Sequence, residues 1–169
     1  MEPTLRRAFN EAYSETLYTR YRERLERAVG PVPFRLAETP AFLPTALRDR
    51  LEAHARSVLA RLSEPSFIKR MRAAVPARFD TPHMDELPSC AQVDFAVVRG
   101  DDGGLDGRVV ELQAFPSLYG FTVEQARAWN DVTHVLPGIS ELRPFFSGLD
   151  EARGLERLRA TVVADGSAR

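Results

Sequence analysis

Cysteine is almost absent from this sequence: among 169 residues, only Cys90 carries a thiol. A single cysteine excludes an internal disulfide and fits a reducing compartment. No apolar run approaches the roughly 18 residues that a membrane-spanning helix needs, and the first residues lack a charged-then-apolar export signal. We therefore expect a cytoplasmic protein with no membrane partner.

Lysine is equally scarce, Lys69 being the only one in the chain. The sequence contains no Gly-x-x-x-x-Gly-Lys-Ser/Thr loop, and Gly103-Gly104 lies among aspartates that would repel a phosphate group. The formal net charge of −1 argues against a general nucleic-acid surface, which needs a marked positive excess. The net charge therefore predicts no nucleic-acid partner. The single lysine and the missing glycine-rich loop predict that the chain lacks a complete phosphate clamp, meaning the groups that would bind the phosphates of ATP.

The remaining composition is that of a globular protein, with 44% hydrophobic and 28% charged residues. A chain of this length fits one domain, which we expect to span residues 1–169. Within it, residues 1–75 would form a helical part, and residues 90–169 a hairpin followed by helices.

Apolar spacing predicts helices over Thr4–Val29, Thr45–Leu62, Pro65–Ala74 and Leu149–Val163, and a further helix that starts at a Thr122-x-x-Gln125 capping box. The first of these is predicted as one long helix. Its apolar residues recur every four positions, as Leu5, Phe9, Tyr13, Leu17, Tyr21 and Leu25. In the second predicted helix, the place of His54 beside the apolar stripe predicts a histidine packed in the core.

Two apolar segments, Val93–Val98 and Arg108–Gln113, flank an Asp- and Gly-rich tip at Gly100–Gly107. This pattern predicts a β-hairpin. Strict alternation along both strands would bury six residues on one face, namely Val93, Phe95, Val97, Val110, Leu112 and Ala114. The predicted fold is therefore α+β, with N-terminal helices packed on a small antiparallel sheet that is built around this hairpin and followed by two helices.

The same alternation would place Asp94, Ala96, Val98, Val109, Glu111 and Gln113 on the opposite face. Two carboxylates and an amide oxygen then meet across the strands, and these are donors that Mg²⁺ accepts. The other interpretation is an ordinary amphipathic hairpin whose polar face meets water or the arginines of the chain. Spacing alone favours this second interpretation.

The segments Gln92-Val93-Asp94-Phe95 and Glu111-Leu112-Gln113-Ala114-Phe115-Pro116-Ser117-Leu118 resemble a signature of the ATP-grasp carboxylate–amine ligases. The order of parts is most similar to that of the circularly permuted, glutathionylspermidine synthase-like members. Their pattern runs approximately Arg-x-Asp-Phe, a hairpin, Glu-x-Asn-Ala, and then a turn with a small hydroxyl residue. The resemblance covers about residues 90–130.

The resemblance implies that Asp94, Glu111 and Gln113 hold Mg²⁺ against the phosphates of ATP, and that Gln92 and Ser117 contact substrate. Two positions depart from the family pattern. Gln113 stands where the family has asparagine, and Gln92 stands where it has arginine.

From the resemblance we expect the N-terminal part of a longer Mg²⁺- and ATP-dependent ligase that joins small carboxylate and amine substrates. Because the phosphate clamp is missing, this part would be inactive alone. The alternative is a non-catalytic binding or assembly domain that retains the hairpin. If the remainder of such a ligase normally covers an unpaired strand edge beside the hairpin, this part alone would self-associate through that edge.

Overall fold

The computed structural model describes residues 2–82, 88, 90–114, 118–134 and 141–163. In this part of the chain, six α-helices accompany one antiparallel pair of strands, which confirms the α+β class. The chain folds into two compact units. The aromatic unit comprises Met1–Pro44 and Ser117–Arg169, and the hairpin unit comprises Thr45–Pro116.

The first helical stretch is two helices, α1 (Pro3–Ala12) and α2 (Glu15–Val29), so the prediction of one long helix is wrong. The break lies at Ser14, whose backbone is extended and whose Oγ accepts a hydrogen bond of 3.1 Å from the Leu17 N–H. A side-chain oxygen at this position satisfies one of the free N–H groups of a new helix. The helix therefore restarts at Glu15.

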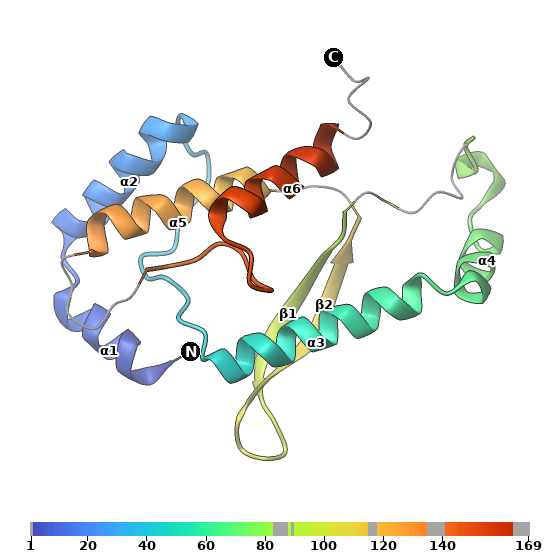
Figure 1. Cartoon of the computed structure of the whole chain (residues 1–169), viewed down its shortest axis with the longest axis horizontal. Coiled ribbons are helices and arrows are strands. Elements are labelled where there is room, and N and C mark those ends of the chain that lie inside the picture. The colour runs from blue at the N-terminus through green and yellow to red at the C-terminus, as the bar shows by residue number, and fades with distance from the viewer. Residues whose placement is uncertain (1, 83–87, 89, 115–117, 135–140, 164–169) are drawn as a thin grey trace. The chain divides into compact units, whose positions relative to one another are not determined.

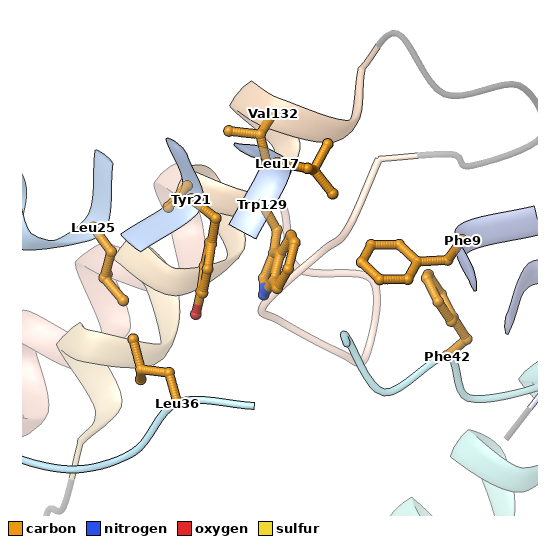
Figure 2. Close-up of a cluster of buried hydrophobic side chains, with 9 residues drawn as sticks. Phe9, Leu17, Tyr21, Leu25, Leu36, Phe42, Trp129 and Val132 are labelled. Carbon is orange, nitrogen blue, oxygen red and sulfur yellow. The ribbon is translucent and has the colours of Figure 1, made fainter. Parts of the chain in front are cut away.

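The core of the aromatic unit forms where the predicted stripe meets α5 (Tyr119–Thr133) (Figure 2). Tyr21 stacks on Trp129 with ring centroids 3.8 Å apart, and Phe9 meets Trp129 edge-on at 5.5 Å. The stripe prediction is confirmed, because Phe9, Leu17, Tyr21 and Leu25 are buried and Leu5 and Tyr13 pack against them.

Helix α5 begins at Tyr119, three residues earlier than the predicted capping box. Thr122 lies inside the helix and donates to the Leu118 carbonyl, while Gln125 donates to the Tyr21 hydroxyl over 3.0 Å. The capping-box prediction is therefore wrong. Tertiary contact with the aromatic core, rather than a local cap, engages the Gln125 side chain.

The last helix, α6 (Glu151–Val163), belongs to the same unit. Gly154 is buried on it, because the Phe145 ring fills the space where a side chain would project. The segment before α6 is held to α5 by Asn130, whose side chain donates to the Leu142 carbonyl and accepts from the Leu142 N–H.

The hairpin unit begins with α3 (Thr45–Leu62), whose limits match the prediction, followed by α4 (Pro65–Ala73) and the short 3₁₀ helix η1 (Ala77–Phe79). In α3, only Leu47 is fully buried. Within the described residues, no helix is both long enough and apolar enough to cross a membrane.

The hairpin consists of β1 (Gln92–Arg99) and β2 (Leu105–Gln113), which form a two-stranded antiparallel sheet beside α3 (Figure 1). The tip is shorter than predicted, since β2 already begins at Leu105. The left-handed backbone of Gly103, with φ of 76°, closes this tip. Gly107 lets α3 approach β2, because a side chain there would overlap Leu51 of α3.

A β-bulge changes which residues share a face of the hairpin. Asp94 pairs with Glu111, but its neighbour Phe95 pairs with Val109, so Val110 is an extra residue in β2. Val109 consequently takes the place predicted for Val110 on the apolar face. Arg108 pairs with Ala96 and joins the polar face, where strict alternation had placed Val109.

The apolar face is only partly covered, which corrects the prediction of a six-residue core. Val93 and Phe95 are half-buried, whereas Val97 is 47% and Leu112 is 40% exposed. Ala114 lies beyond the end of β2 and is exposed. Val110, on the bulge, is 68% exposed.

Candidate functional site

The two carboxylates singled out by the sequence lie directly opposite each other across the hairpin. Asp94 of β1 is half-buried and pairs with Glu111 of β2, which is exposed. The Cβ atoms of directly opposed residues lie about 4.5–5.5 Å apart and point to the same face. The two acids thus face one small volume of space, as the sequence pattern predicted.

Gln92 and Gln113 form the next pair along the same face, and both are half-buried. The Gln92 side-chain nitrogen donates to the Asp94 Oδ1 over 3.0 Å. Gln92 therefore orients the Asp94 carboxylate from its own strand. Ser117, the remaining predicted substrate contact, lies outside the described residues.

Arg108 is the residue of this face that the sequence analysis missed. It is exposed and stands opposite Ala96, one step along the face from the pair of acids. Arg108 and Glu111 are three positions apart, so strict alternation assigns them to opposite faces. Leaving Val110 out of the count restores the alternation of polar and apolar residues in β2, and this was the signal available in the sequence.

The donor set fits only one kind of metal site. Among the described residues, no group of three or more His, Cys, Asp or Glu side chains is close enough to hold an ion. Two carboxylates and amide oxygens suit a Mg²⁺ ion that keeps waters or takes phosphate oxygens as its other ligands. They do not suit an ion that is enclosed by protein groups alone, such as a structural zinc.

A second polar cluster holds the tip end of the hairpin to α3. Arg50 donates to the Leu105 carbonyl over 3.1 Å and to Asp102 over 3.0 Å, and His54 contacts Asp106 at 3.1 Å. The His54 side chain is 45% exposed, so the prediction of a histidine packed in the core is wrong. This cluster attaches the hairpin to its helix.

Both carboxyls of this cluster have lowered pKa values. The Gly104 N–H and the Arg50 guanidinium lower the pKa of Asp102, and the Gly107 N–H and His54 lower the pKa of Asp106. Each N–H bond stabilises the ionised form, since a carboxylate accepts more strongly than a carboxylic acid. The two acids are therefore engaged in holding the hairpin tip.

Comparisons with known proteins identify no relative of this chain. No family model matches the sequence, and no curated protein and no solved structure is significantly similar to it.

Proposed function

We propose that the hairpin is the Mg²⁺-holding segment of an ATP-grasp-like carboxylate–amine ligase that acts in the cytoplasm. The observation that supports the proposal is the cross-strand pairing of Asp94 with Glu111, flanked by the pair Gln92 and Gln113. The family resemblance implies the same residues in the same role.

In this proposal Asp94 and Glu111 supply charged oxygen donors, and Gln113 supplies an amide oxygen from the adjacent position of β2. Gln92 fixes the Asp94 carboxylate through its hydrogen bond. A substrate contact by Ser117, which lies outside the described residues, remains part of the proposal. Bound Mg²⁺ would offset the charge on the phosphoryl group that is transferred.

The reaction implied by the resemblance has two steps. The carboxylate of one substrate attacks the terminal phosphate of ATP, which releases ADP and leaves an acyl phosphate. The amine of the second substrate then attacks the acyl carbon, forms the amide bond and displaces inorganic phosphate. The described residues of this chain contribute only the metal-holding part.

The experiment that tests the proposal is a calorimetric titration of the full chain with Mg²⁺, alone and with ATP. We expect Asp94→Asn and Glu111→Gln each to lower the Mg²⁺ affinity at least about tenfold, since even groups that merely orient ligands are worth about 10–100-fold. Mg²⁺ should also raise the melting temperature of the unaltered chain, because an ion that binds only the folded state stabilises it.

Asp101→Asn provides the matched control. Asp101 is an exposed acid at the tip of the same hairpin, outside the proposed donor set. Its substitution should leave the Mg²⁺ affinity unchanged. An equal loss in the Asp101 variant, or no heat and no thermal shift with the unaltered chain, would overturn the proposal.

A second candidate function is a non-catalytic assembly domain. The observation that favours it is the exposed apolar side of the hairpin, where Val97 and Val109 are each almost half exposed. An assembly domain needs no metal, so failure of the Mg²⁺ titration would leave this candidate standing.

A further inference from the structure

The two edges of the hairpin differ in how open they are to another strand. β2 carries the bulge at Val110, and α3 packs against it at Gly107. β1 has no bulge, no proline and no lysine, and within the described residues it pairs only with β2. Bulges, lysines and prolines are among the features that block edge pairing. Lysine and proline are absent from β2 as well, so the bulge and the contact with α3 distinguish the two edges, and within the hairpin unit β1 is the edge more open to pairing.

We propose that β1 pairs antiparallel with β1 of a second copy of this chain, about a two-fold axis at Phe95. The result is a four-stranded sheet in the order β2, β1, β1, β2. A two-fold axis perpendicular to the sheet keeps each face on its own side, so apolar residues continue to meet apolar residues.

On the apolar face this register joins the half-covered residues of both copies. The central row is Val109, Phe95, and then Phe95 and Val109 of the second copy, because Phe95 pairs with Val109 within each hairpin. In the rows on either side, Val93 lies opposite Val97 of the other copy. The side chain of Val97, 47% exposed in the single chain, thereby gains a neighbour.

On the polar face the same register brings opposite charges into one row. Asp94 lies opposite Ala96 of the second copy, and that Ala96 is paired with Arg108 of its own hairpin. The row is therefore Glu111, Asp94, Ala96 and Arg108. Because alanine is small, the long Arg108 side chain reaches over it toward the two carboxylates, and symmetry repeats this row.

The neighbouring registers lack this complementarity. With the axis at Asp94, the row becomes Glu111, Asp94, Asp94 and Glu111, which sets four acids side by side. With the axis at Ala96, the central row has the Arg108 of each copy at its two ends. Asp94 of one copy then lies opposite Val98 of the other. Like charges in one row destabilise a sheet, so charge selects the register centred on Phe95.

Sedimentation velocity of the full chain over a range of concentrations tests the dimer. We expect a reversible monomer–dimer equilibrium in which Val97→Lys raises the dissociation constant by about tenfold or more, because each dimer contains Val97 twice. Val110→Lys is the matched control: Val110 is 68% exposed but lies on the bulge of β2, away from the interface. A monomer at every concentration, or equal effects of the two lysines, would overturn the proposal.

A disulfide experiment tests the register. In a background of Cys90→Ser, chains with Val93→Cys and chains with Val97→Cys are mixed and oxidised. The proposed register places these two positions directly opposite each other, so the mixture should form covalent dimers. Neither variant alone should do so, since like positions lie four residues apart along the paired strands. Equal yields in the mixture and the single variants would refute the register.

The charge row has its own test, which does not involve Mg²⁺. Arg108→Glu should weaken the dimer by roughly tenfold or more, because it places acids in both symmetry-related rows. The double variant Asp94→Lys with Arg108→Glu should restore it. If the Arg108 substitution leaves the dissociation constant of the dimer unchanged, the charge row does not form. The register centred on Phe95 then loses its support.

Discussion

Gly154 is a residue whose missing side chain is a structural requirement. It is buried in α6, and a Cβ atom there would overlap the ring of Phe145. The ring contact is therefore possible only with glycine, which is the fourth residue of α6 although glycine is a poor helix former. The close contact between α6 and the preceding segment therefore depends on a residue of low helix propensity.

We expect Gly154→Ala to lower the free energy of unfolding by about 1–3 kcal/mol, the usual cost of forcing an extra methyl group into a packed site. Gly120→Ala is the comparison: this glycine is also helical, but nothing lies within 4 Å of a Cβ placed on it. That variant should be neutral or slightly stabilising. Urea denaturation followed by Trp129 fluorescence measures both, and equal effects would contradict the prediction.

At the scale of elements, the attachment of the hairpin tip to α3 depends on ionised acids. Asp102 accepts from the Gly104 N–H over 2.9 Å and Asp106 accepts from the Gly107 N–H over 2.8 Å. Because both pKa values lie below the ordinary 3.8, their stabilising contribution is complete above that pH. It is lost as the pH falls through the lower pKa of each folded carboxyl.

We therefore expect the amide proton resonances of Gly104 and Gly107 to titrate with midpoints below 3.8 in the folded protein. An NMR pH titration measures these midpoints. Asp106→Asn should abolish the transition at Gly107 and keep that at Gly104, because each amide reports on a different carboxylate. A midpoint at or above the ordinary value would show that these hydrogen bonds do not persist in solution.

Element boundaries were predictable where local chemistry decides them. α3 has the predicted limits because Pro44 precedes it and its apolar spacing is regular. The break at Ser14 was missed because the stripe of Tyr13 and Leu17 continues across it, so periodicity alone cannot reveal it. The local signal was the Ser14 hydroxyl, which caps the new helix.

The candidate site was predictable in part, because the local sequence also specifies the hairpin. The pairing of Asp94 with Glu111 follows from two alternating segments joined by a Gly-rich tip. The place of Arg108 was not predicted, because the only sign of the bulge is a pair of adjacent valines, Val109 and Val110, which a strand without a bulge also tolerates. Partial exposure of the apolar face also escaped prediction, since an alternating pattern does not say how much of a face another element covers.

At the scale of the whole molecule, burial is unevenly divided between the two units. The buried hydrophobic cluster, including the fully buried Phe9, Tyr21 and Leu25, belongs to the aromatic unit. Among the residues of the hairpin, only Gly107 is buried. Regions with few buried apolar contacts open at lower free-energy cost.

We accordingly expect amide hydrogen exchange to be slowest in α2 and α5 and faster in β1 and β2, when measured on dilute protein. Mass spectrometry after exchange, with peptides covering each element, gives the comparison. Protection of the strands equal to that of α2 would contradict it. At high concentration the proposed dimer should slow exchange in β1 more than in β2.

Val110 has the character of an insertion in an otherwise regular strand. With Val110 left out, β2 alternates without interruption, with Asp106, Arg108, Glu111 and Gln113 on one side and Gly107, Val109 and Leu112 on the other. The chain thus absorbs one additional residue without changing which chemical groups share a side. A chain lacking Val110 would keep the same residues on each face of the hairpin. Its β2 strand would be straighter, because a bulge bends and twists the strand that contains it.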